Sequence, residues 1–189
     1  MWSKAVRLFL AINLGEEVRR AAWEATAPLR EAAPGVAWVA SAKLHLTLKF
    51  LGELPEQQAA AVIASVDEAS RRHRVFAMQL GGVGAFPNFR RPRVVWMGVT
   101  PEPRLELLHH DVEVACERLG FAVDGRAFRP HLTLARARER EGGAMRGLAR
   151  VGKRVTFETA TRVESVDLMT SVLGAAARYE RVHAARLRA

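Results

Sequence analysis

The chain has 189 residues, 49% of them hydrophobic and 26% charged, a composition typical of a globular protein with one core or two closely associated lobes. Its single cysteine, Cys116, excludes an intramolecular disulfide and a cysteine-based metal cluster, and it indicates a reducing, cytoplasmic location. The formal charge of +9 favours a polyanionic partner such as nucleic acid, although a GC-rich genome explains an arginine-rich composition equally well. No stretch has the length and apolar character of a membrane span or a secretory signal, so neither is expected.

Hydrophobic spacing predicts strands and helices in turn along the first half of the chain. Residues 5–12 are expected to form a buried strand, and a helix with Pro28 near its end follows Gly15. A short strand over 36–40 and a longer one over 44–51 come next, and then a helix that begins near Pro55.

The second half begins with a predicted hairpin, whose strands span 75–86 and 93–100 and whose tip carries Arg90, Arg91 and Arg93. A helix over 103–119 follows, and the charged, glycine-containing stretch 138–153 is expected to be a mobile loop. Late strands are expected over 155–157, 162–170 and 179–182. Because strands outnumber helices and adjoin one another in sequence, the expected fold is α+β with mainly antiparallel sheets.

The quartet His-Leu-Thr-Leu occurs twice, starting at His45 and at His131. In a strand, alternate side chains share a face, so each His lies beside its Thr (Thr47, Thr133) while the leucines face a core. A single such histidine is more often an ordinary, partly exposed side chain than a catalyst. Exact repetition favours a site built from two similar lobes that face each other across a cleft.

Two imidazoles suit phosphoryl chemistry, because near neutral pH one can accept a proton while the other donates one. The threonine hydroxyls can donate hydrogen bonds to phosphate oxygens, where negative charge grows. Metal-dependent hydrolysis would need carboxylates at ligand spacing, and neither quartet contains one, so no metal is expected. The cluster of residues 109–111 is expected on a helix surface, and His73 and His183 are expected to be solvated.

These motifs and their flanks resemble the 2H phosphoesterase superfamily, and more closely the bacterial RNA 2′,3′-cyclic phosphodiesterases, also called 2′-5′ RNA ligases. The matching stretches are residues 7–12, 44–52, 84–87, 92–96 and 128–136. The resemblance implies one catalytic domain over 1–189, made of two similar lobes in a pseudo-two-fold α+β fold. Two mainly antiparallel sheets would face each other across a central cleft, with helices outside and no cofactor or metal.

The resemblance further implies hydrolysis of an RNA-terminal 2′,3′-cyclic phosphate to a 2′-phosphomonoester, with 2′-5′ ligation of RNA (tRNA fragments among them) as the reverse reaction. His45 would be the general acid and His131 the general base, and the family places an arginine at Arg136 near the phosphate. Strict alternation, however, turns Arg136 away from the His131 face and sets Lys49 on the His45 face, where it would bind substrate. A cytoplasmic monomer without an obligatory protein partner is expected.

Two other functions remain open from the sequence. The chain could be an RNA-end binding module without turnover, although phosphate binding alone does not need two titrating groups. It could also be a 2H phosphodiesterase acting on small cyclic nucleotides, and the basic tip at Arg90, Arg91 and Arg93 favours a polymer over this alternative.

Overall fold

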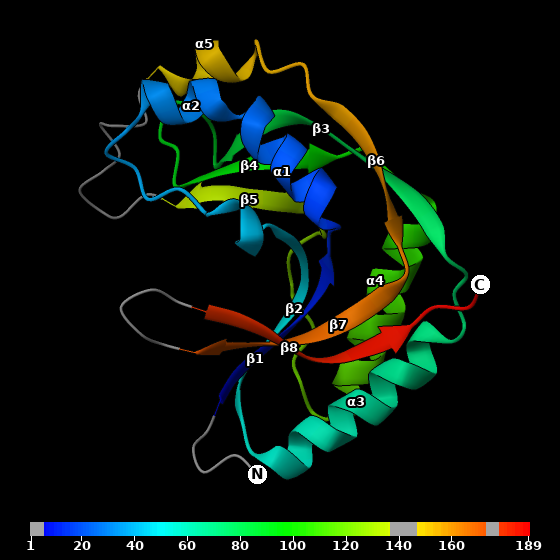
Figure 1. Ribbon diagram of the computed structural model, residues 1–189. Coiled ribbons are helices and arrows are strands. Elements are labelled where there is room, and N and C mark those ends of the chain that lie inside the picture. The colour runs from blue at the N-terminus through cyan, green and yellow to red at the C-terminus, as the bar shows by residue number, and fades with distance from the viewer. Residues whose placement is uncertain (1–5, 137–146, 173–177) are drawn as a thin grey trace.

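The computed structural model describes residues 6–136, 147–172 and 178–189. Eight strands, five α-helices and one 3₁₀ helix, η1, follow one another along these residues (Figure 1). In chain order they are β1 (Val6–Asn13), α1 (Glu16–Ala25), α2 (Ala27–Ala32), η1 (Ser41–Lys43), β2 (His45–Leu54), α3 (Glu56–Ser70), β3 (Phe76–Phe86), β4 (Val94–Val99), α4 (Pro103–Glu117), β5 (His131–Arg136), α5 (Leu148–Gly152), β6 (Glu158–Val163), β7 (Ser165–Val172) and β8 (Arg178–Arg186).

All eight strands belong to one curled antiparallel sheet with the order β6-β3-β4-β5-β2-β1-β7-β8. Its two four-stranded halves meet where β2 pairs with β5, and the pair formed there is Leu46 with Leu132. The expected α+β architecture with antiparallel strands is confirmed. The two expected sheets are the halves of one sheet, because this single ladder pair connects them.

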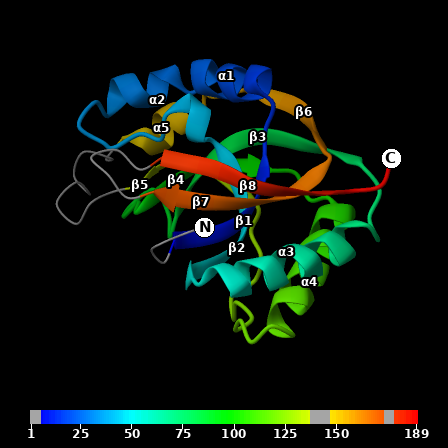
Figure 2. The same cartoon turned by 60° about the horizontal axis from the view of Figure 1, so that its bottom comes forward.

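The helices lie in two groups, one for each half of the sheet (Figures 1 and 2). Helices α3 and α4 pack against each other, with α3 also on β7 and β8 and α4 on β2. On the other half, α2 packs against α5, which contacts β3. The elements therefore cross over: α1 and α2 follow β1 in the chain, yet they cover the half of the sheet that contains β3, β4 and β5.

The strand β1 shows how the sheet divides apolar side chains between its faces. Leu8, Leu10 and Ile12 are at most 1% exposed and belong to the main core. Phe9 and Ala11 alternate with them and form a separate small cluster with Met169 on the opposite face. Alternation in a strand thus gives one face to the core beneath the helices and the other to the inside of the curl.

Several local expectations change. Residues 155–157 precede β6 without forming a strand, and the expected strand over 162–170 is divided between β6 and β7. The predicted helix after Gly15 is divided at Thr26 into α1 and α2, and Pro28 lies in the first turn of α2, where its missing N–H costs nothing. Residues 36–40 form an isolated bridge from Trp38 to Ala135 and no continuous strand. Of the expected loop 138–153, residues 148–152 are helix α5, and residues 137–146 lie outside the described part. Within the described ranges, no helix is long and apolar enough to cross a membrane.

Candidate active site

The two His-Leu-Thr-Leu quartets lie side by side on β2 and β5, where the first leucine of each quartet pairs with that of the other. Because the strands are antiparallel, this register sets His45 beside Thr133 and Thr47 beside His131. The leucines are at most 5% exposed, whereas the His and Thr side chains are half-buried on the opposite face. The predicted division of each quartet is confirmed, and an approximate two-fold axis passes between the paired leucines.

Both imidazoles are held by the same backbone contact. Nδ1 of His45 lies 2.8 Å from the carbonyl oxygen of Lys43, and Nδ1 of His131 lies 2.7 Å from that of Arg129. A carbonyl oxygen can only accept, so Nδ1 carries a proton in each ring and donates it. In the neutral imidazole Nε2 is then unprotonated and free to act as a base, and in the imidazolium it can act as an acid.

Aromatic side chains flank each histidine on the inner face of the sheet. Ring centroids lie 5.1–6.4 Å from the imidazoles, with Phe9 and Tyr179 beside His45, and Phe86 and Trp96 beside His131. Phe9 is packed and also contacts the histidine: it is 3% exposed, and its ring lies 5.1 Å from that of His45.

Burial lowers the pKa of both His45 and His131 below the usual imidazole value, because it disfavours the charged ring. The backbone hydrogen bond from each Nδ1 opposes this shift, and the positive charge of Arg136 lowers each pKa further. One guanidinium therefore acts on both imidazoles. At neutral pH the lowered pKa values favour neutral rings.

A β-bulge in β5 brings Arg136 to the His131 face. Two consecutive residues of β4 pair with Thr133 and Ala135, which leaves Leu134 as an extra residue in β5. An inserted residue shifts the alternation by one position, so Ala135 is fully buried and Arg136 is exposed on the inner face, where it lines the same cavity as Thr133. Strict alternation therefore gave the wrong face for Arg136, which lies on the face that carries His131 and Thr133.

The same bulge occurs in β2 and has the opposite consequence for Lys49. Consecutive residues of β1 pair with Thr47 and Lys49, which leaves Leu48 as the extra residue. Lys49 is therefore 6% exposed beneath the sheet, and Phe50, 66% exposed, takes the position equivalent to Arg136. The expectation that Lys49 shares the His45 face is wrong, because the bulge reverses the alternation after Thr47, although Lys49 is among the residues that line the cavity shared by Thr47 and Arg136.

The ammonium of Lys49 is bound from the helical side of the sheet. Its Nζ lies 2.6 Å from Oε2 of Glu113 in α4 and donates to the carbonyl oxygen of Ala122 at 2.8 Å. Glu113 is also nearly buried, at 5% exposure, and was missed in the sequence. Its place between Val112 and Ala115, inside the apolar stripe of the helix, was the signal that could have found it.

Two cavities open beside the histidines. One of about 1080 Å³ is lined by His131, both motif threonines, Arg136 and further arginines from neighbouring loops, namely Arg93, Arg126 and Arg129. The other, of about 400 Å³, is lined by His45. Arg93 is the residue of the predicted basic tip that reaches the larger cavity.

Three of the four other histidines have structural contacts. His109, expected on a helix surface, is half-buried and stacks on Phe128 with centroids 3.7 Å apart. His73, expected to be solvated, is 8% exposed and lies 2.9 Å from Asp111, and His183 pairs with Asp67 at 2.9 Å. The expectation was wrong for His109 and His73, whereas His110 is exposed and His183 is only partly buried; packing between separate elements brings Asp111 to His73 and Asp67 to His183. Within the described residues no three His, Cys, Asp or Glu side chains are arranged to hold a metal ion.

The curled antiparallel sheet and the paired His-x-Thr motifs at its centre define a two-histidine phosphoesterase. Within this class, the chain belongs to the 2′-5′ RNA ligase superfamily, whose family model matches residues 18–174.

Similar proteins agree with this membership. The chain is 33% identical to the RNA 2′,3′-cyclic phosphodiesterase of Thermotoga maritima, over 70% of this chain and 71% of that protein. It is 34% identical to the protein of the same name from Geobacillus stearothermophilus, but spans only 42% of that longer sequence. Among solved structures, TT0787 of Thermus thermophilus is 33% identical with a TM-score of 0.76, covering 96% of this chain and 98% of that one. Escherichia coli LigT complexed with 3′-AMP is 29% identical with a TM-score of 0.74, covering 97% and 98%.

Proposed function

We propose that the chain hydrolyses an RNA-terminal 2′,3′-cyclic phosphate to a 2′-phosphomonoester, without a metal ion. The observation that carries the proposal is the matched pair of imidazoles: both donate from Nδ1 to a carbonyl and both leave Nε2 for chemistry. The names of the relatives, RNA 2′,3′-cyclic phosphodiesterases, supply the substrate class. Residues 1–189 then act as one catalytic domain to which each half of the sheet contributes one motif.

The reaction is an in-line displacement at phosphorus. Nε2 of His131 takes a proton from water as its oxygen attacks, the bond from phosphorus to O3′ breaks, and Nε2–H of His45 protonates the departing O3′. Each imidazole contributes roughly 10²–10⁴-fold. Thr47 and Thr133 donate to the non-bridging oxygens, and the guanidinium of Arg136 stabilises their growing negative charge. The same steps, with a 5′-hydroxyl of RNA in place of water as the attacking group, give a 2′-5′ linkage.

The decisive assay incubates the protein in EDTA with an RNA that ends in a 2′,3′-cyclic phosphate and identifies the product isomer. We expect the 2′-phosphate, and a loss of roughly 10²-fold or more in His45→Ala and His131→Ala. An aryl phosphodiester separates the roles, because its leaving group needs no proton: His45→Ala should keep most activity on it, and His131→Ala should not. Retained RNA activity in His131→Ala would refute its role as base. Tight RNA-end binding without turnover would instead support the binding-module alternative.

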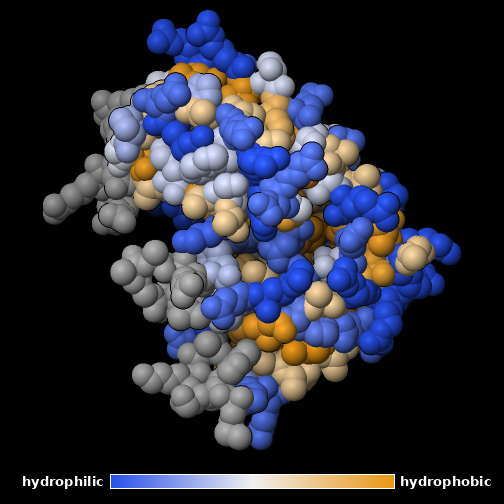
Figure 3. Space-filling model, viewed as in Figure 1, coloured by the Kyte–Doolittle hydropathy of each residue, from blue (hydrophilic) through white to orange (hydrophobic). Residues whose placement is uncertain are grey.

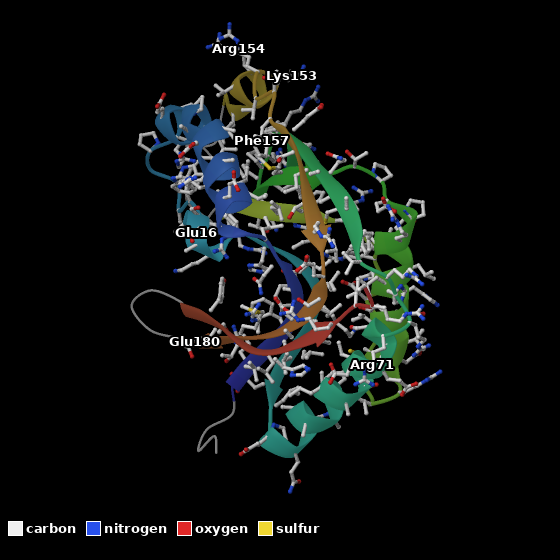
Figure 4. All side chains as sticks on the ribbon, turned by 45° about the vertical axis from the view of Figure 1, so that its right-hand side comes forward. Glu16, Arg71, Lys153, Arg154, Phe157 and Glu180 are labelled. Carbon is white, nitrogen blue, oxygen red and sulfur yellow. The ribbon has the colours of Figure 1, made fainter. Side chains whose placement is uncertain are left out.

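A polymer rather than a small cyclic nucleotide is the proposed substrate because arginines outnumber carboxylates in the lining of the larger cavity. Part of the positive charge lies elsewhere: Figure 4 shows Lys153 and Arg154 beyond the end of α5, far from β2 and β5. The positive charge at the tip of the β3–β4 hairpin is therefore the charge whose effect on RNA binding should be tested. Neutralising Arg90, Arg91 and Arg93 should raise the KM for RNA far more than that for a cyclic mononucleotide, and equal effects would favour the small substrate. We place the reaction in the cytoplasm and expect a monomer.

A further inference from the structure

The cavity on the His45 side is lined by three cationic side chains from separate elements. Arg19 comes from α1, Lys43 from η1 and Arg181 from β8, and these elements approach one another beside the start of β2 (Figure 1). The surface between α1 and β8 is mainly hydrophilic (Figure 3). The arrangement is not a product of local sequence, because the three residues are far apart in the chain.

Within the part of the chain that the structure describes, no carboxylate lines this cavity. Figure 4 places Glu16 at the start of α1 and Glu180 on β8, and neither is a lining residue. Arg181 has an anionic partner in Asp167, whose Oδ2 lies 3.6 Å from Nη1 of Arg181. Among the described residues, Arg181 is thus the one cation of the three with a carboxylate at ion-pair distance.

That carboxylate is already bound by neutral groups. Asp167 is 1% exposed and accepts hydrogen bonds from Asn13 at 2.6 Å and from Ser165 at 2.7 Å. Nε of Arg19 is buried without a hydrogen-bond partner among the described residues, although a buried donor is costly to leave unpaired. Like charges held together with an unsatisfied donor indicate a site for an anion that the protein chain itself does not supply.

We propose that this cavity, defined by Arg19, Lys43 and Arg181, binds the phosphate on the 5′ side of the terminal nucleoside. The proposal rests on the proposed function. His45 protonates O3′, so the ribose that carries O3′ lies on the His45 side of the reacting phosphorus. The 5′ oxygen of the same ribose then leads toward this cavity, and arginine forks suit the phosphate attached to it. The site therefore selects a nucleotide that continues on its 5′ side, as an RNA end does.

The kinetic test compares adenosine 2′,3′-cyclic phosphate with the same compound carrying a 5′-phosphate. The wild-type protein should prefer the 5′-phosphorylated substrate in kcat/KM by about 10- to 100-fold, a factor typical of one or two charge-assisted hydrogen bonds. In Arg19→Gln and Arg181→Gln this preference should fall toward 1. Arg20→Gln, an exposed neighbour in α1, removes one charge from the same helix and should leave the preference unchanged. Equal rates on both substrates in the wild type would overturn the proposal.

A binding measurement decides the question without turnover. By calorimetry, adenosine 2′,5′-bisphosphate should bind the wild-type protein about 10-fold or more tighter than adenosine 2′-monophosphate, and Arg19→Gln should lose that increment. If neither cyclic compound is hydrolysed while the increment is present, the proposed function fails and the phosphate site stands. If hydrolysis proceeds with no increment, the phosphate site fails and the proposed function stands. Arg181→Gln, on a different element, repeats the test should Arg19→Gln not fold.

Discussion

Replacing Lys49 by methionine removes one partner of a buried ion pair while keeping the length of the side chain. The Lys49 and Glu113 side chains are 5% and 7% exposed, and their charged atoms lie 2.6 Å apart. Removing one partner leaves the carboxylate of Glu113 buried and uncompensated, which costs about 3–5 kcal/mol of the free energy of unfolding. For a domain of ordinary stability that is a large fraction of the total.

The double variant Lys49→Met, Glu113→Leu should recover most of this loss, because an apolar pair of similar volume is tolerated where a lone buried charge is not. It still leaves the carbonyl of Ala122 without its donor, so recovery stops about 1–3 kcal/mol short of the wild type. Denaturant unfolding of the four proteins in the cycle measures the coupling between the two residues.

Arg7→Met provides the matched control on the neighbouring strand. Arg7 and Glu53 form a pair at 4.0 Å with both side chains more than half exposed, so its loss should cost at most about 1 kcal/mol. A Lys49→Met variant as stable as Arg7→Met, or a double variant showing no coupling, would refute the reasoning.

The same variants test the expectation that Lys49 binds substrate. A structural role predicts that the Lys49→Met, Glu113→Leu protein, at a temperature where it is folded, keeps kcat/KM within a few-fold of the wild type. A substrate-binding role predicts a raised KM at unchanged stability.

Two further outcomes follow from the site. Burial and the charge of Arg136 lower the pKa of both motif histidines, so the form with one protonated histidine is most populated below pH 6.5. The bell-shaped pH profile of kcat/KM should therefore have its centre below pH 6.5. Arg136→Gln should move that centre to higher pH, whereas Arg126→Gln, a variant in the same cavity, should leave it unchanged. In Gly84→Ala the added Cβ would overlap the ring of Trp96, which flanks the imidazole of His131. That overpacking should cost about 1–3 kcal/mol in a thermal or denaturant unfolding experiment, whereas Gly125→Ala, with open space around it, should cost little.

How far the sequence predicts this site is clearest in the motif strands. The alternation of His-Leu-Thr-Leu is a local property, and the buried leucines and half-buried histidines follow from it directly. The helical stripe after Pro103 likewise predicted α4 to within two residues of its end. The repeated quartet also predicted two similar halves, which the sheet shows as four strands on each side of the β2–β5 junction.

Other features depend on which segments meet. Bulges at Leu48 and Leu134 arise from pairing with β1 and β4, and a single chain does not display the register of its neighbours. For that reason Lys49 and Arg136 were both assigned to the wrong face by alternation. The pairing of His73 with Asp111 and of His183 with Asp67 also joins separate elements, which spacing along the chain cannot show.

The sequence by itself determined the two strands, the identity of the four motif side chains and the face that each presents, because the geometry of an extended backbone fixes these within a few residues. Only the tertiary structure decided that both imidazoles share one tautomer and the charge of one guanidinium, and that three distant cations surround a cavity beside His45. The physical reason is that hydrogen bonds, burial and Coulomb interactions act through space, and their partners are set by the packing of segments that lie far apart in the chain.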